Sequence, residues 1–126
     1  MAPRFPLQTE GAHSAEFILS EANGNRSRDS AYFADPTTLK VGTPCKQTVA
    51  ATTDTPATYT VAAAGVDCQA LTIYGGASVS GEGLRVSVIT RDAEVNGRLI
   101  NWGALSSAEQ IAGAAALLAK GIVVRI

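Results

Sequence analysis

The sequence predicts a mainly β fold of the α+β class: a small β-sandwich or barrel-like domain with one C-terminal α-helix at about residues 107–120 and a flexible N-terminal arm. Three observations support this prediction. Short apolar or alternating segments recur between turn residues from Phe17 onward, which is typical of β-strands. One segment, 107–120, has helical spacing with signals at both ends. Residues 1–15 contain two prolines, one glycine and no sustained periodicity, which is typical of an extended arm.

Length and composition predict one small domain. At 126 residues the chain is long enough for a single domain, which we expect to occupy residues 16–126 after the arm. The hydrophobic fraction of 46% leans on alanine, and the aromatic residues are one Trp, three Tyr and three Phe. A thin core of this kind gains from burying further surface against copies of the same chain. Composition alone therefore slightly favours an oligomer.

Charge and hydropathy exclude several classes of partner. Lys and Arg number 10 and Asp and Glu 11, whereas a nucleic-acid-binding protein usually carries a basic surplus that neutralises phosphates. The N-terminus has no apolar stretch of signal-peptide length, and the longest apolar run, 111–119, is too short to span a bilayer. We therefore expect no nucleic-acid or membrane partner and a cytoplasm-like compartment. In that compartment Cys45 and Cys68 are expected to stay reduced, as small buried hydrophobes.

The first third of the chain predicts two short strands and the turns that follow them. Residues 17–19 are an apolar triplet typical of a strand, and residues 20–29 are a polar turn region with Asn23-Gly24 at its centre. A second short strand at 32–34 ends at Asp35-Pro36, because this pair initiates turns.

The middle of the chain predicts further strands separated by loops. Residues 39–49 alternate loosely between apolar and polar side chains, and their glycine and proline indicate a bend or a sheet edge. Residues 48–60 are rich in Thr, Ala and Pro, the composition of an exposed loop, and strands are expected at 59–62 and 71–74. Residues 75–83 contain four glycines and predict a mobile loop or a pair of turns.

The clearest strand signal lies at residues 84–91. Alternate side chains there point to opposite faces, with Leu84, Val86 and Val88 on one face and Arg85, Ser87 and Ile89 on the other. After it, Asn96-Gly97 is a strong signal for a two-residue hairpin turn.

The helix at 107–120 is defined at both ends. Ser106 and Glu109 are spaced as a capping box, in which each side chain binds the other residue's free backbone N–H. Lys120 suits the negative end of the helix dipole, and Gly121 can adopt the left-handed conformation that ends helices. Residues 122–126 then predict a closing strand. The apolar face that should pack on the β framework consists of Ile111, Ala114, Ala115 and Leu118.

No set of residues predicts catalysis, a metal site or a cofactor. The single histidine, His13, lies in the predicted arm, where nothing would hold partners in fixed geometry. Asp92 and Glu94 are expected to share one face of a strand, but two exposed acids near a turn are commoner than an acid–base pair. Residues 76–80 and 81–86 each miss one residue of a nucleophile-elbow or dinucleotide fingerprint, and neither precedes a helix.

Three segments of the chain resemble, in residues and in order, the head decoration proteins of tailed phages, the family that includes protein D of phage lambda. The segments are Glu16–Asp29 with Gly42-Thr43 after it, Val88–Asn96, and Ala114–Arg125. Relatives often carry alanine where this chain has Gly97, which leaves open a turn running into Leu99 and Trp102 instead of the hairpin.

This resemblance implies a capsid cement protein that is not an enzyme. Such proteins form homotrimers on the outer surface of the expanded head, where they hold neighbouring subunits of the major capsid protein together, and they are assembled in the host cytoplasm. The resemblance also implies that the N-terminal arm lies against the shell, with its binding residues at Arg4, Phe5, Pro6, Leu7 and Gln8. Four further residues are candidates for either the core or the trimer contact: Trp102, Ala114, Ala115 and Leu118.

A different class of function stays open beside this one. A small β-rich module of a phage tail or adhesion component could bind a carbohydrate. Sugar sites usually present aromatic platforms, and the aromatic residues Tyr32, Tyr59, Tyr74 and Trp102 are scattered along the chain. The sequence therefore favours capsid decoration over carbohydrate binding.

Overall fold

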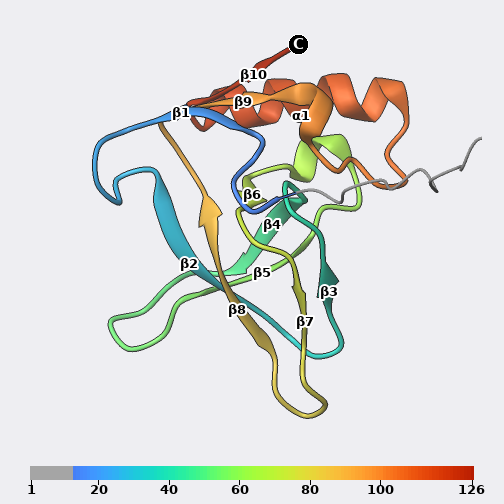
Figure 1. The fold of residues 1–126 in the computed structure, drawn as a ribbon. Helices are drawn as coiled ribbons and strands as arrows, with labels where there is room; N and C mark the ends of the chain where they lie inside the picture. Colours follow the sequence, from blue (N-terminus) through green and yellow to red (C-terminus); the bar gives the residue numbers. More distant parts are fainter. Residues whose placement is uncertain (1–12) are drawn as a thin grey trace, which may run out of the picture.

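The computed structural model describes residues 13–126. In it five strands close into a barrel, and a three-stranded sheet with one α-helix covers one end of that barrel (Figure 1). In barrel order the strands are β2 (Arg28–Phe33), β5 (Ala57–Val61), β4 (Pro44–Val49), β6 (Ala70–Thr72) and β8 (Leu84–Ile89). β2 pairs antiparallel with β8 and closes the barrel. The short strands β3 (Thr38–Leu39) and β7 (Gly76–Ala77) pair beside it.

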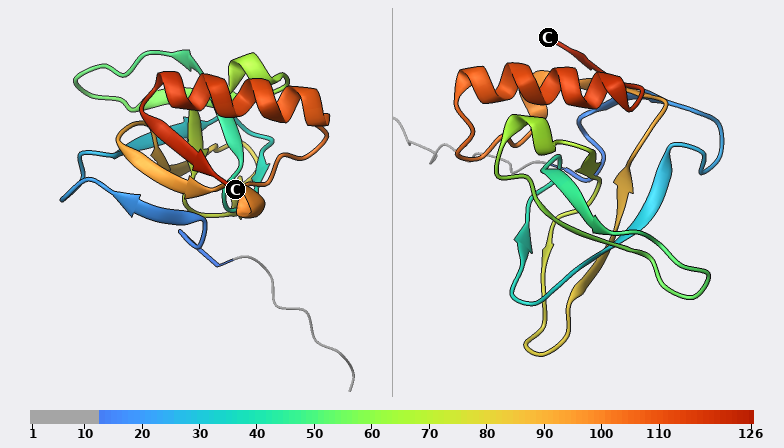
Figure 2. Two further views of the ribbon diagram at one scale, coloured as in Figure 1. Left: turned by 90° about the horizontal axis from the view of Figure 1, so that it is seen from above. Right: turned by 180° about the vertical axis from the view of Figure 1, so that it is seen from behind.

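The layer above the barrel brings both ends of the described chain together. It contains β1 (Ile18–Glu21), β9 (Ala93–Asn96), β10 (Ile122–Arg125) and α1 (Ser107–Ala119). β9 is central, antiparallel to β1 and parallel to β10. Figure 2 shows α1, β10, β9 and β1 side by side across this layer. The predicted mainly β fold with one C-terminal helix is confirmed.

Two hydrophobic cores follow from this arrangement. The lower core fills the barrel, where Phe33, Val86 and Val88 are buried. The upper core lies between the barrel end and the covering layer, and Phe17 and Leu117 are fully buried there. β8 serves both cores, because its alternating side chains point Val86 and Val88 into the barrel while Ile89, on the opposite face, is buried in the upper core. The strong strand pattern of residues 84–91 is thus confirmed.

The two cysteines are buried and free, as expected. Cys45 belongs to the lower core and Cys68 to the upper core. Burial raises the pKa of both thiols, that of Cys68 to about 11. They therefore contribute to packing as small apolar groups.

Several strand boundaries differ from the prediction because pairing partners extend the strands. β2 begins at Arg28, so the predicted turn of residues 20–29 is confined to the segment between β1 and β2. The buried Ser27 side chain accepts a hydrogen bond from the Ala22 N–H and donates one to the Asp92 carbonyl, which holds this turn against the upper layer. The predicted loop 48–60 is likewise shorter, because β4 extends to Val49 and β5 begins at Ala57.

The predicted hairpin at Asn96-Gly97 is wrong. Asn96 ends β9, and its side-chain oxygen accepts a hydrogen bond from the Arg98 N–H, which begins the 3₁₀ turn η2 (Gly97–Leu99). The chain then runs on toward Trp102, as the alternative suggested, and β9 receives β10 as its parallel neighbour. A parallel partner needs a crossover connection, and α1 is part of that connection.

α1 confirms the predicted helix and half of its capping box. The Ser106 hydroxyl accepts a hydrogen bond from the Glu109 N–H at 3.3 Å, and Gly121 ends the helix with φ +85°. The Glu109 carboxylate, however, accepts a hydrogen bond from the Gly65 N–H of the 3₁₀ turn η1 (Gly65–Asp67). The side chain that should complete the cap therefore fastens α1 to η1.

The predicted packing face of α1 is wrong. The buried residues of the helix are Gly113 and Leu117, whereas Ile111 and Leu118 are 74% and 59% exposed. The helix is apolar on most of its circumference, so its spacing did not distinguish the face that packs. Close approach to Trp102 and Cys68 selects the side of Gly113, where a larger side chain would not fit.

Candidate interaction surfaces

The outward side of α1 is an exposed apolar ridge, the α1 ridge, which consists of Ile111, Ala115 and Leu118. Glu109 is the sole charged residue within the helix, and its carboxylate binds the Gly65 N–H. The ridge therefore presents uncharged, apolar surface to solvent. Exposed apolar patches on a small protein often mark a contact with another protein.

An apolar groove of about 680 Å³, the α1 groove, lies beside this ridge between α1, η2 and the end of β10. The side chains that matter for its character are Arg98, Trp102, Ile111, Ala114, Val124 and Ile126. Trp102 is half-buried because its ring packs on the upper core, and the ring also lines the groove. Ile126 is 99% exposed and extends the apolar surface to the end of the chain.

The four candidate contact residues lie at different depths around α1. Trp102 belongs to both the core margin and the groove, and Ala114 lines the groove. Ala115 and Leu118 are exposed on the α1 ridge, so the core interpretation is wrong for these two residues. The structure thus places Trp102 and Ala114 in the α1 groove and Ala115 and Leu118 on the ridge beside it.

The candidate arm residues Arg4, Phe5, Pro6, Leu7 and Gln8 lie outside the described residues. The described chain begins at His13 and turns at once, with the Glu16 N–H bonded to the His13 carbonyl at 3.1 Å. The Ala15 N–H donates to the Ile73 carbonyl at 3.0 Å, and Ala15 packs against the upper core. Residues 13–15 of the predicted arm are therefore attached to the folded domain.

A second apolar surface lies on the barrel and was not found from the sequence. This barrel hollow, of about 670 Å³, is formed by Tyr32, Val49, Pro56, Thr58, Glu82 and Arg85. Val49 is 58% and Tyr32 38% exposed. Its residues come from segments distant in the sequence, which only the barrel pairing brings together. Val49, within the threonine-rich segment, was the one sign of this surface in the sequence.

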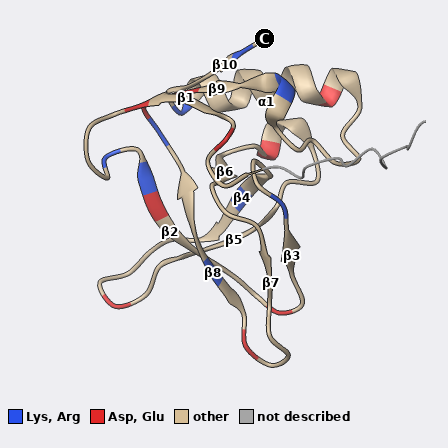
Figure 3. Cartoon of the chain, in the orientation of Figure 1, with Lys and Arg blue, Asp and Glu red and all other residues tan. Residues whose placement is uncertain are grey.

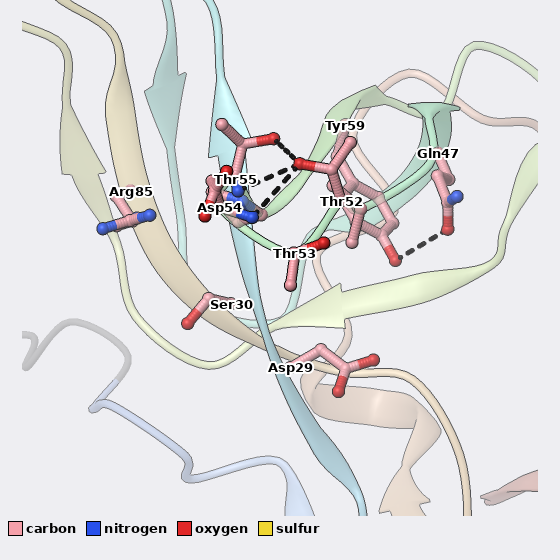
Figure 4. A pocket seen from close by; sticks show the side chains of 12 residues that line it. Asp29, Ser30, Gln47, Thr52, Thr53, Asp54, Thr55, Tyr59 and Arg85 are labelled. Atoms are coloured by element: carbon pink, nitrogen blue, oxygen red, sulfur yellow. Dashed lines mark hydrogen bonds between the residues drawn. The ribbon is translucent and has the colours of Figure 1, made fainter.

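A polar pocket of about 550 Å³ lies between the β4–β5 loop and the barrel wall (Figure 4). The Tyr59 hydroxyl donates to Gln47 at 3.4 Å, and burial raises the pKa of Tyr59 to about 12. The carboxylate of Asp29 is held by Arg91 at 2.5 Å. Because Tyr59 is only 5% exposed, its ring offers no platform on which a sugar could stack.

The two carboxylates considered for acid–base work do not form a pair. Asp92 precedes β9 with a left-handed φ of +48°, so the predicted common strand face is not formed. Hydrogen bonds from Arg125 and Ser20 hold the pKa of Glu94 below its usual range, whereas a general acid requires a raised pKa.

The described part of the chain contains no group of three His, Cys, Asp or Glu residues placed to hold a metal ion. Within the same residues, no helix combines the length and hydropathy needed to cross a membrane. What the described surface offers is apolar areas suited to contacts between proteins, among them the α1 ridge and groove and the barrel hollow.

Comparison with protein families finds a match to this chain. The family model of the bacteriophage lambda head decoration protein D matches residues 7–122. The matched range includes the whole barrel hollow, α1 and Trp102, but not Val124 and Ile126 of the α1 groove. The comparison with curated proteins finds no match.

Proposed function

The chain belongs to the family of the bacteriophage lambda head decoration protein D, a family of structural proteins of the phage capsid, and we propose that three copies of it assemble on the outer surface of the expanded head. There the trimer would join neighbouring subunits of the major capsid protein and stabilise the shell. The single observation that carries this proposal is the family match over residues 7–122.

Stabilisation of the shell follows from linkage. A protein that binds the assembled lattice and not the separated subunits shifts the equilibrium toward the lattice. The decoration protein needs no catalytic group for this role. Its surface has to recognise an arrangement of capsid subunits that exists only in the expanded shell.

The N-terminal arm is proposed as the part that grips the shell. Phe5 and Leu7 are its large apolar residues, and Pro3 and Pro6 favour extended backbone. An extended segment can add to an exposed strand or loop of the capsid protein through main-chain hydrogen bonds. Each arm would bind weakly, but three arms on one trimer raise the effective concentration at the shell and hence the overall affinity.

The carbohydrate-binding alternative has no specific support on the described surface. Tyr59 is buried in the polar pocket, Tyr32 lies at the barrel hollow, and Trp102 lines the α1 groove. Tyr74 is 44% exposed and lines none of these three. These rings belong to separate places in the fold and do not make one platform for a sugar ring.

The test combines mass measurement with binding to shells. The wild-type chain and a Phe5→Ser, Leu7→Ser variant are each measured by light scattering and then sedimented with expanded heads of the cognate phage. We expect both proteins to be trimers, with wild type on the shells and the variant bound at least roughly tenfold more weakly. A chain that stays monomeric at high concentration and does not sediment with shells would contradict the proposal.

A further inference from the structure

We propose that the trimer is held by two different surfaces of each copy: the α1 ridge and groove of one copy pack against the barrel hollow of the next. This inference rests on the proposed function, because it takes the trimer as its starting point. Its occupant is a second copy of this chain, with the N-terminal arm left free for the capsid.

Symmetry requires two unlike surfaces. In a closed ring of three copies each contact is heterologous, so one patch of a subunit meets a different patch of its neighbour. The α1 groove, of about 680 Å³, and the barrel hollow, of about 670 Å³, lie on separate elements of the same chain. One surface is built by α1, η2 and β10, and the other by the barrel strands and the loops that join them.

The next requirement is enough exposed apolar surface. A stable interface removes roughly 800 Å² from each partner, which is about a tenth of the 7825 Å² that the chain exposes. The α1 ridge and groove extend from Ile111 and Leu118 to Ile126, and these three large apolar side chains are 74%, 59% and 99% exposed. The barrel hollow offers Val49 and Tyr32 as its apolar counterpart.

Each of the two surfaces carries a charged group that could meet an opposite charge on the other. Arg98 lines the α1 groove and Lys120 follows the helix, and neither has an acidic partner within ion-pair distance among residues 13–126. At the barrel hollow, Glu82 is likewise without a basic partner in that part of the chain, as is Asp54 of the β4–β5 loop, which lines the polar pocket. Acidic residues occupy the loops at the barrel end farthest from α1 (Figure 3). The hollow itself is lined by one acid, Glu82, and one base, Arg85, so Glu82 is the group there that could pair with Arg98.

The ion pairs of the sheet layer explain why that region is a weaker candidate. Arg28 binds Glu21 at 2.6 Å, and Arg125 binds Glu94 at 2.5 Å. These charges are satisfied within one copy, whereas Arg98 and Glu82 have no ion-pair partner among residues 13–126 and could gain one from another chain.

Charge reversal tests the pairing in the full-length protein. Arg98→Glu and Glu82→Arg should each raise the dissociation constant of the trimer at least roughly tenfold, as measured by sedimentation equilibrium. The double variant should recover most of the loss, because the opposite charges meet again with their positions exchanged. Two single variants that dissociate no more readily than wild type would overturn the inference.

A matched pair of substitutions, each replacing an exposed apolar residue by lysine, tests the ridge itself. Ile111→Lys places a charge on the α1 ridge, and Leu19→Lys does the same on β1 at a side chain that is 55% exposed and belongs to neither surface. We expect Ile111→Lys to be monomeric and Leu19→Lys to remain a trimer, with unchanged circular dichroism for both. A trimer that persists in Ile111→Lys would refute the role of the ridge.

Cysteine cross-linking distinguishes the proposed contact from a symmetric one. Cys45 and Cys68 are fully buried, so an engineered pair, Ala115→Cys with Val49→Cys, supplies the accessible thiols. Under mild oxidation the double variant should give covalent trimers, and each single variant should stay uncoupled. Covalent dimers from Ala115→Cys alone would show that the ridge meets itself and would overturn the inference.

The outcomes also separate this inference from the proposed function. If wild type is a trimer on shells but Ile111→Lys is also a trimer, only the assignment of the interface fails. If wild type is a monomer that ignores shells, the proposed function fails first and the interface with it.

Discussion

The indole ring of Trp102 lies so close to Gly113 that a Cβ atom on residue 113 would come within 2.8 Å of the ring carbon Cζ3. The same Cβ would lie 3.0 Å from the sulfur of Cys68. This contact orients α1, because the one helix position without a side chain faces the ring that closes the upper core. The opposite side of the helix, with Ile111 and Leu118, is thereby turned to solvent.

Gly113→Ala should therefore destabilise the protein, although alanine is the better helix former. We expect a loss of about 1–3 kcal/mol from overpacking, measured by urea unfolding. Ala115→Gly is the control, since residue 115 is exposed and the substitution should cost only about 1 kcal/mol of helix propensity. A Gly113→Ala protein more stable than wild type would show that the ring moves freely.

Gly65→Ala should disrupt the junction between η1 and α1. A Cβ on residue 65 would collide with the backbone carbonyl of Glu109, which cannot move without unwinding the first turn of the helix. We expect a loss of about 2 kcal/mol or more in thermal or urea unfolding. Gly76→Ala is the matched control, because its nearest neighbours are Leu84 side-chain atoms at 3.6 Å and its cost should be small.

Acid should destabilise the protein in part through the ion pair of Glu21 and Arg28. Hydrogen bonding to Arg28 lowers the pKa of Glu21 in the folded state below its ordinary value of 4.5. A lowered pKa means that the stabilisation is complete above that ordinary value and is lost as pH falls through the folded pKa. Glu21→Gln should cost about 1 kcal/mol or less at neutral pH and should flatten the decline of stability below pH 4.5. Equal pH profiles for the two proteins, measured by urea unfolding, would contradict the role of this pair.

Both cysteines should resist thiol reagents until the protein unfolds. Burial raises the pKa of Cys68 to about 11, so at pH 8 only on the order of one thiol in a thousand is ionised. Colorimetric titration with a disulfide reagent should show almost no fast reaction in buffer and two equivalents in denaturant. Rapid labelling of the native protein would indicate that the upper core opens readily.

The local elements of this fold could be predicted because their causes are local. Ser106 and Gly121 delimit α1, and the alternation of residues 84–91 matches β8. The hairpin at Asn96-Gly97 failed for a tertiary reason: β9 takes β1 and β10 as partners, so no strand returns directly after it. The threonine-rich segment was predicted as loop, since nothing local indicates that Val49 pairs with Thr58 and Ala57 with Ala31 in the barrel wall.

The candidate interaction surfaces likewise combine features that could be predicted from the sequence with features that depend on the tertiary structure. The sequence by itself determined the mainly β class, the single helix, the resemblance to head decoration proteins and the residues of interest on α1. Only the tertiary structure decided which side of α1 is buried, because an alanine-rich helix can pack on several faces and the ring of Trp102 admits only the side of Gly113. The barrel hollow, likewise, exists only after closure brings Tyr32, Val49 and Glu82 together from distant parts of the chain.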